Sequence, residues 1–237
     1  ATAEGAKDNI DLRGYKVNFA MESDPRCYHI KSGSVLNITD SVGGGTLVKD
    51  NTKSYTAWGS FLWVYGSSDN YASGGTLNLY AGTLDGNNAD SSNESGVMHI
   101  ENVGTFNMYG GTVKDGIATA GGNITVKGTM NLYAGTVTGG TATDALGGNI
   151  RIYPAAKLNM YGGEITDGTG NNNWGGNVLV QGEMTMSGGE IYGGNENADG
   201  PGANLVLHGS GKLDMSGGHI HGRMRQFNSA NTGLNVS

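Results

Sequence analysis

Apolar and polar residues alternate in short segments along most of the chain, and similar segments return at regular intervals. A segment of the type "LNLY" occurs six times, and its first apolar residues are Leu77, Phe106, Met130, Leu158, Met184 and Leu213. The steps between these residues are 29, 24, 28, 26 and 29 positions. Alternation with a period of two predicts a β-strand with one buried face, so the pattern indicates a repeat built from strands.

Each repeat contains three such segments with glycine between them. The first reads "NITV" at Asn123 and "NIRI" at Asn149, the second is the "LNLY" segment, and the third reads "GTV" or "GEI". Because each strand type recurs only once per repeat, stacking the repeats pairs every strand with its own copy. We therefore predict an all-β fold, a parallel β-helix (solenoid) with three short strands per coil and about eight coils.

The repeats extend over the whole chain, which we predict to be a single β-helix domain spanning residues 1–237. Residues 1–60 hold the N-terminal coils and an insertion after Val48, and residues 61–237 hold the regular repeats. The final alternation "GLNV" at Gly233 is expected to begin the first strand of a further coil. We expect the chain to be a fragment of a larger surface protein, with end-to-end self-association at its uncovered strand edges.

Outward positions of successive coils should form columns about 4.8 Å apart. One column holds Tyr80, Tyr109, Tyr133 and Tyr161, and a neighbouring column includes Asn107 and Asn131. Tyrosine supplies a rigid contact surface with a polar tip, so these residues are candidates for binding a sugar or a protein partner. The alternative is that the tyrosines only stabilise the sheet by stacking on one another.

Two further groups of residues are candidate sites. Trp58 and Trp63 lie in an aromatic group near the insertion and are candidate anchors for a partner. Glu164, Glu190 and His219 share a column, and carboxylates beside a histidine are a chemically possible arrangement for cleaving glycosidic bonds. The alternative is that these three side chains are simply solvated.

Two further expectations concern local structure. Glu101 is expected to pair with Lys127 across coils. The asparagines after "GG" are expected to adopt left-handed turn conformations; they are Asn123, Asn149 and Asn177.

Composition narrows the classes of function. The formal net charge is −7 and no basic run occurs, which disfavours nucleic acid as a partner. The single cysteine, Cys27, excludes an internal disulfide framework and a cysteine-built zinc site. No apolar run approaches the roughly 18 residues that span a membrane, so no membrane insertion is expected. We predict no metal and no cofactor.

Two groups of motifs carry a resemblance to a known family. They are "NIDLRGYKVNF" with "VLNITDSVGGGTLV", between Asn9 and Val48, and the later units that combine "GGNI" with "LNMYGG". These segments resemble repeats of bacterial cell-surface proteins of the gut Firmicutes type, which have a right-handed, pectate-lyase-like β-helix. The resemblance implies an extracellular, adhesin-like module on the bacterial cell surface. The catalytic strings of pectate lyases and polygalacturonases are absent, so no catalytic residues are carried over.

These observations predict a non-catalytic extracellular surface module of the adhesin type. It would bind a host surface protein or a glycan, or act as a rigid spacer. The alternative is a polysaccharide-active enzyme, a glycoside hydrolase or lyase, that uses Glu164, Glu190 and His219.

Overall fold

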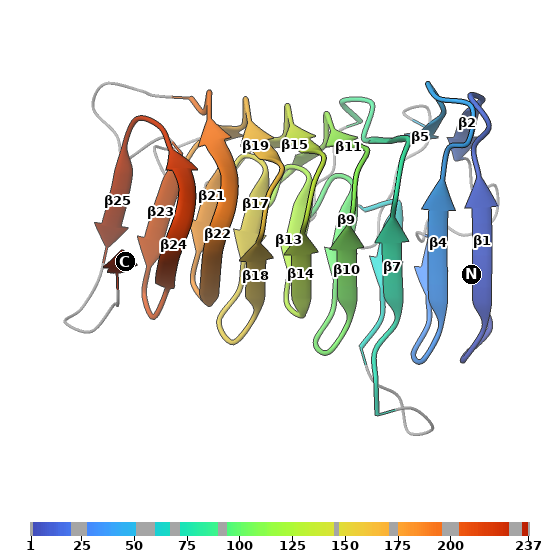
Figure 1. Ribbon diagram of the computed structural model, residues 1–237, viewed down its shortest axis with the longest axis horizontal. Coiled ribbons are helices and arrows are strands. Elements are labelled where there is room, and N and C mark those ends of the chain that lie inside the picture. Colours follow the sequence, from blue (N-terminus) through green and yellow to red (C-terminus); the bar gives the residue numbers. More distant parts are fainter. Residues whose placement is uncertain are drawn as a thin grey trace.

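The computed structural model describes residues 2–19, 28–50, 60–66, 72–89, 94–144, 147–170, 175–195, 204–227 and 234–236. Cys27, Trp58 and most of the insertion lie outside these residues. The described chain contains only short strands, turns and irregular segments, with no helix. The strands stack side by side along the long axis of the molecule, and the N- and C-termini lie at opposite ends (Figure 1). The predicted all-β parallel solenoid is confirmed.

The first strand of each coil lies in an eight-stranded parallel sheet, which we call sheet one. Its spatial order is β25 (Met224–Phe227), β23 (Leu205–His208), β21 (Val178–Val180), β17 (Ile150–Ile152), β13 (Ile124–Val126), β9 (Met98–Ile100), β6 (Leu62–Val64) and β3 (Tyr28–Ile30).

The second strand of each coil lies in sheet two. Its members are β1 (Lys7–Asp11), β4 (Val35–Thr39), β7 (Thr76–Leu79), β10 (Thr105–Met108), β14 (Thr129–Leu132), β18 (Lys157–Met160), β22 (Glu183–Tyr192), β24 (Lys212–Ile220) and β26 (Leu234–Val236). Neighbouring strands are parallel and in register, so that Phe106 lies opposite Leu77 on one side and Met130 on the other.

The third strands form sheet three, with β2 (Lys16–Phe19), β5 (Thr46–Lys49), β8 (Thr83–Asp85), β11 (Thr112–Lys114), β15 (Thr136–Thr138) and β19 (Glu164–Thr166). Strand β22 is long enough to run through both sheets, and it joins sheets two and three into one hydrogen-bonded path. A small fourth sheet of β12 (Ile117–Ala118), β16 (Thr141–Ala142) and β20 (Thr169–Gly170) was not predicted. Two residues per strand are too few to show an alternation.

The coil count comes out slightly below the prediction. Within the described part of the chain, the complete coils are those that begin with β3, β6, β9, β13, β17, β21 and β23, which makes seven. The pairs β1–β2 and β25–β26 are partial coils. The expected place of "GLNV" was wrong: β26 pairs with β24 in sheet two, while β25 supplies the first strand of that coil. The right-handed sense of the coil stays a prediction.

The core is a narrow column of apolar side chains between the sheets. The inward residues of all three sheets are almost completely buried from Leu36 to Leu213. Six methionines are among them: Met98, Met108, Met130, Met160, Met184 and Met186. Methionine adapts its shape to uneven neighbours, which suits a core whose layers alternate between leucine, phenylalanine and isoleucine. Met215 and Ile220 in the last complete coil are only partly buried against this core.

A ladder of buried asparagine amides runs beside the core and joins successive coils. Asn123 donates from Nδ2 to Oδ1 of Asn149 at 2.7 Å, Asn149 donates to Asn177 at 2.7 Å, and Asn177 donates to Asn204 at 2.8 Å. We call these four residues the inner ladder. The expectation of left-handed conformations was wrong, because these asparagines are not among the described residues with positive φ. The "GGN" motif reflects a buried hydrogen-bonding role instead.

Every hydrogen-bonding group of a central inner-ladder amide has a partner. Oδ1 of Asn149 accepts from Nδ2 of Asn123 and from the backbone N–H of Gly140 at 2.9 Å, while Nδ2 donates to Oδ1 of Asn177 and to the carbonyl of Thr166 at 2.7 Å. An amide offers two N–H donors and two oxygen lone pairs, so this amide is saturated. The ladder therefore supplies hydrogen-bond partners to backbone N–H and carbonyl groups that the turns would otherwise leave buried without one.

The aspartates of the N-terminal motifs also tie coils together. Asp40 accepts hydrogen bonds from the backbone N–H groups of Gly45 and Gly14, each at 2.7 Å. Asp11 accepts from the hydroxyl of Ser41 at 2.6 Å and from its backbone N–H at 2.9 Å. The hydrogen bond from Gly45 lowers the pKa of Asp40 below its ordinary value. These hydrogen bonds join the segment "NIDLRG", which contains Asp11, to the segment "ITDSVGGG", which contains Asp40, and this explains why the two motifs occur together.

Two non-glycine residues occupy left-handed backbone positions in the turns between sheets one and two. Val103 has a φ of 58° and Ala155 a φ of 66°, while the same turn position elsewhere is taken by Gly5 and Gly33. A left-handed conformation is costly for residues with a side chain branched at Cβ. Val103 is 55% exposed, so the strain is not offset by burial of its side chain.

Replacing Asn149 with alanine should lower the free energy of unfolding by about 3 kcal/mol, because four buried groups lose their partner. The matched variant Asn107→Ala removes a half-buried amide on the outer face of sheet two and should cost about 1 kcal/mol or less, since water can reach the groups that lose their partner. Denaturant unfolding followed by circular dichroism measures both values. Equal losses of unfolding free energy in the two variants would contradict the larger contribution assigned to the inner ladder.

Replacing Val103 with asparagine should stabilise the protein by about 1 kcal/mol, because asparagine tolerates the left-handed region. The control is Val42→Asn, since Val42 is also exposed but does not have positive φ. A thermal melt should show a higher midpoint for the first variant and little change for the second. A lower midpoint for Val103→Asn would show that the turn is not strained.

Candidate functional site

The outer face of sheet two carries the same pair of residues on four successive coils. We call this surface the Tyr–Asn face; it consists of Asn78, Asn107, Asn131 and Asn159 with Tyr80, Tyr109, Tyr133 and Tyr161. Each asparagine lies in one of strands β7, β10, β14 and β18, and each tyrosine directly follows the strand. The in-register pairing of these strands places like residues above one another, as the sequence predicted.

The four tyrosine rings form one continuous stack. Consecutive ring centroids are 4.9, 4.9 and 4.8 Å apart, and consecutive ring planes differ by 11°, 6° and 10°. The residues are nevertheless 40 to 49% exposed. The faces of the inner rings are therefore covered by neighbouring rings, and the accessible parts are the ring edges and the hydroxyl groups. Burial and the adjacent rings raise the pKa of Tyr109, which keeps its hydroxyl protonated as a donor.

The asparagines beside the stack form a second amide ladder, which we call the outer ladder. Asn159 donates to Asn131, Asn131 to Asn107, Asn107 to Asn78, Asn78 to Asn37 and Asn37 to Asn9, each at 2.8 Å. Thr185 closes this series by donating from its hydroxyl to Oδ1 of Asn159 at 2.9 Å. The outer ladder thus extends further toward the N-terminus than the column predicted from sequence.

The two ladders differ in how much hydrogen-bonding capacity they leave unused. A central outer-ladder amide such as Asn107 uses one N–H and one oxygen lone pair within the ladder. Since an amide has two of each, one donor and one acceptor per coil remain for water or a ligand. The inner ladder leaves none. The Tyr–Asn face therefore presents a periodic row of donors and acceptors beside a row of phenol hydroxyls.

The pattern of the Tyr–Asn face changes at β22 and β24. Thr185 follows Asn159 in register, and Asp214 and Asn235 follow Thr185 on the next strands. Ser187 occupies the place of a tyrosine, directly after Met186, whose register partner Met160 precedes Tyr161. A hollow of about 340 Å³ lies on this part of the surface and is lined by Glu183, Met184, Thr185, Lys212, Leu213, Asp214 and Asn235.

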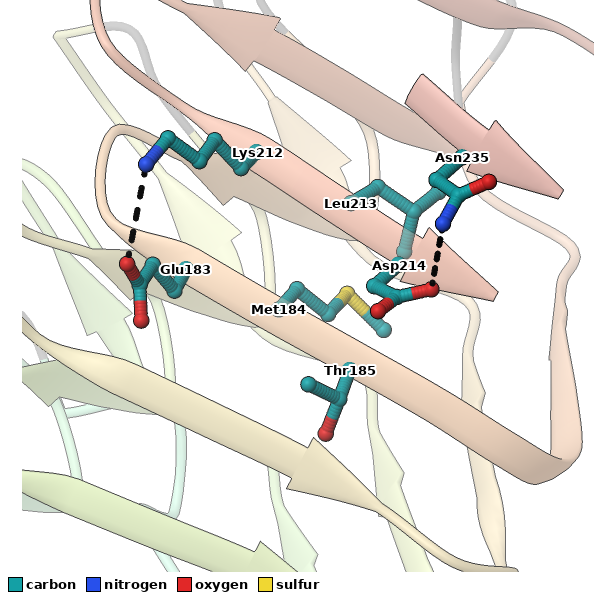
Figure 2. Close-up of a pocket in the computed structure, with 7 residues that line it drawn as sticks. All are labelled: Glu183, Met184, Thr185, Lys212, Leu213, Asp214 and Asn235. Atoms are coloured by element: carbon teal, nitrogen blue, oxygen red, sulfur yellow. Dashed lines mark hydrogen bonds and ion pairs between the residues drawn. The ribbon is translucent and has the colours of Figure 1, made fainter. Parts of the chain in front are cut away.

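Charged and polar groups border this hollow. Figure 2 shows Lys212 reaching toward Glu183 on one side, with Nζ 3.8 Å from Oε1, and Asn235 reaching toward Asp214 on the other. The Nδ2 atom of Asn235 lies 3.4 Å from Oδ1 of Asp214. Lys157 also contacts Glu183, at 3.3 Å. The hollow thus offers carboxylate, hydroxyl and amide groups on an open surface.

The candidate catalytic column is assembled as predicted but is exposed. Glu164, Glu190 and His219 are register partners on β19, β22 and β24. Tyr192 donates its hydroxyl to Oε2 of Glu164 at 3.0 Å, and Nε2 of His221 lies 3.5 Å from Oε2 of Glu190. The hydrogen bond to Glu164 raises the pKa of Tyr192. About half of the Glu190 side chain faces solvent, so water has free access to these groups.

Trp63 lies on sheet one, away from the tyrosines, and is only 8% exposed. Its ring contacts the rings of His29, Tyr65 and His99, with centroids 5.9, 5.6 and 5.2 Å away. Little of its surface remains for a partner. Trp58, the other predicted aromatic anchor, falls outside the described residues.

A network of ionisable groups lies beside this aromatic group on sheet one. Glu94 contacts Nζ of Lys127 at 2.9 Å and accepts a hydrogen bond from the hydroxyl of Tyr153 at 2.7 Å. His99, which is buried, bonds through Nε2 to Oε1 of Glu101 at 3.1 Å. We call these five residues the Glu94 network. The predicted pair of Glu101 with Lys127 is not a direct contact, because the ammonium of Lys127 lies against Glu94 instead. The hydrogen bond with His99, and to a smaller extent the charge of Lys127, lower the pKa of Glu101.

The Glu94 network links three coils. Burial by itself raises the pKa of Glu94, but the hydroxyl of Tyr153 and the ammonium of Lys127 outweigh it, and the pKa is lowered overall. Burial and the carboxylate of Glu94 raise the pKa of Tyr153. At neutral pH these groups are an ionised carboxylate and a protonated phenol, so neither is prepared to exchange a proton. We interpret these contacts as structural: they hold three successive coils together.

Sequence reasoning missed Glu94 because its partner Tyr153 lies 59 positions away and two coils further along. Glu94 also sits before its strand, in a loop, where the repeat gives no column to follow. In the described residues, no three His, Cys, Asp or Glu side chains are grouped so that they could hold a metal ion. Nor does the described chain contain a helix that is long and apolar enough to cross a membrane.

No protein-family model matches the chain, and comparisons with curated proteins and with solved structures give no significant match.

Replacing Glu94 with glutamine should reduce the free energy of unfolding at neutral pH by about 1 to 2 kcal/mol, because charge-assisted hydrogen bonds are lost. The lowered pKa of Glu94 means that its contribution is present above the unfolded value of about 4.3 and fades as pH falls through the folded value. The difference between the two proteins should therefore shrink below about pH 4.

The matched control is Glu183→Gln, whose exposed pairs with Lys157 and Lys212 should be worth less than about 1 kcal/mol. Urea unfolding across a pH series measures both variants. A pH-independent difference for Glu94→Gln would contradict the assigned role of the carboxylate.

Proposed function

We propose that the protein is a non-catalytic, adhesin-like extracellular module whose Tyr–Asn face binds a neutral linear glycan. The observation that carries this proposal is the half-used outer ladder beside an exposed row of tyrosine hydroxyls. In the inner ladder, which serves only the fold, every donor and acceptor of a central amide has a partner within the protein. A second ladder on the surface, with one donor and one acceptor free on each coil, offers recognition chemistry that the fold does not need.

A glycan fits this chemistry well. Sugar hydroxyls both donate and accept hydrogen bonds, and they recur at regular intervals along a linear chain, as the amides and phenols do along the rod. Tyrosine hydroxyls can likewise donate and accept, and rigid aromatic side chains lose little entropy on binding. The net charge of −7 disfavours a polyanionic ligand. The ligand is therefore assigned as a neutral chain rather than an acidic one.

The N-terminal repeats support a location outside the cell. The segments between Asn9 and Val48 resemble those of bacterial cell-surface proteins, which supports an extracellular place. Catalysis by Glu164, Glu190 and His219 is not favoured, because these side chains are exposed on an open face, where solvent weakens the interactions that would set an acid apart from a base. The experiment that tests glycan binding also distinguishes it from two other functions: recognition of a host surface protein, and a rod that only spaces other domains.

The double variant Tyr109→Phe with Tyr133→Phe should weaken glycan binding about tenfold, because two hydroxyl contacts are lost while the ring stack is retained. The matched control is Thr112→Val with Thr136→Val, which removes two hydroxyls from register partners on sheet three and should leave binding unchanged. The probes are soluble linear oligosaccharides of glucose, mannose and N-acetylglucosamine, with affinity measured by titration calorimetry.

If no probe binds the unmodified protein, the proposal is wrong and protein recognition or spacing remains. Equal weakening by the two double variants would place the binding surface elsewhere. Release of reducing sugar that is abolished by Glu190→Gln would overturn the non-catalytic assignment.

A further inference from the structure

We infer that the end of the Tyr–Asn face at β22 and β24 is the principal sugar-binding site, with the hollow as a hydrogen-bonding subsite and Tyr161 as its stacking platform. This inference rests on the proposed function and assigns it to one place on a repetitive surface. Three separate features meet there: the end of the ring stack, the end of the outer ladder and the hollow of about 340 Å³.

The first feature is an open aromatic face. Among the stacked tyrosines only the two end rings have a face without a tyrosine neighbour. Beyond Tyr161 the column continues with Ser187, whose side chain is too small to cover a phenol ring, and Tyr161 is the most exposed of the four at 49%. Beyond Tyr80 the column holds Thr39, which has a branched and larger side chain. A sugar ring can therefore stack on Tyr161 more readily than on any other member.

The second feature is a missing donor at the end of the outer ladder. Thr185 gives its only hydroxyl proton to Asn159, so toward the next coil it presents lone pairs. The register partner in that coil is Asp214, whose carboxylate also accepts only. Two acceptors thus follow one another, with the long 3.4 Å contact from Asn235 as the described donor to Asp214. A ligand that donates hydrogen bonds, as a sugar hydroxyl does, would complete the series.

The third feature is the hollow, which brings these acceptors into a concave site. Figure 2 shows Thr185, Asp214 and Asn235 around the same space, with Lys212 and Glu183 at its border. Its volume is at the lower end of the range for small-molecule sites, which suits one pyranose ring better than a larger group. Thr185 and Ser187 are two residues apart on the outer side of one strand, so a sugar ring that stacks on Tyr161 and covers Ser187 would lie about 7 Å from Thr185. Adjacent units of one linear glycan can occupy the platform and the hollow.

The charges of the hollow favour a neutral sugar. Glu183 is bracketed by Lys157 and Lys212, so these three groups largely satisfy one another. Asp214 is left as the carboxylate that faces the space, and it would repel an acidic sugar. Carboxylate, amide and hydroxyl groups next to an aromatic face are suited to the hydroxyls and the apolar face of a neutral pyranose.

The test compares the two ends of the ring stack. Tyr161→Ala and Tyr80→Ala each remove one end ring and one stacking contact, so they should affect stability alike. We expect Tyr161→Ala and Asp214→Ala each to weaken binding of a linear tetrasaccharide at least tenfold. Tyr80→Ala, at the other end of the ring stack, should weaken binding by a clearly smaller factor, and the double variant Thr112→Val with Thr136→Val on sheet three should leave binding unchanged. Tyr161→Phe retains the platform and should retain most of the affinity. Titration calorimetry gives the affinities and thermal melts confirm that each variant is folded.

The outcomes separate this inference from the proposed function. Weaker binding in the Tyr109→Phe with Tyr133→Phe variant, but normal binding in Tyr161→Ala and Asp214→Ala, would place the glycan along the middle of the Tyr–Asn face and overturn the end site alone. Equal losses in Tyr80→Ala and Tyr161→Ala would overturn it as well. Absence of binding by the unmodified protein would overturn both.

Discussion

In-register parallel pairing is the constraint on which the rest of this structure depends. Parallel strands spaced about 4.8 Å apart bring each residue directly against the residue at the same position of the next coil. A polar side chain in such a column needs a neighbour that can both accept from it and donate to it, and asparagine meets this need with itself. The inner ladder from Asn123 to Asn204 applies that solution where water is absent, and the outer ladder from Asn9 to Asn159 applies it at the surface.

The same constraint explains how much could be predicted from sequence. Periodic alternation was enough to predict the solenoid, its strands, its core and the stacked tyrosines, because each of these properties repeats with the coil. Features that do not repeat were missed or misplaced. Glu94 acts from a loop on Tyr153 two coils away, and β26 joins sheet two although its sequence reads like a first strand.

Asn149 shows a subtler limit. Its place after two glycines is typical of a turn residue, and local propensity therefore favoured a left-handed conformation. The observed role depends on Gly140 and Thr166, which lie 9 and 17 positions away and approach only when the coils are stacked. The hollow beside Thr185 is a comparable case: the sequence shows that asparagine is replaced there, but only the structure shows that residues of β22, β24 and β26 border a hollow at this place.

The self-complementary ladders also affect how such a rod can change in length. If one whole coil were removed, Asn107 would meet Asn159 in place of Asn131, and each amide would find a partner identical to the one it lost. A deletion of half a coil would instead bring unlike columns together and break every ladder at once. The rod is therefore free to be lengthened or shortened in units of a complete turn. Its reach changes in steps of about 4.8 Å, while its surface chemistry stays the same.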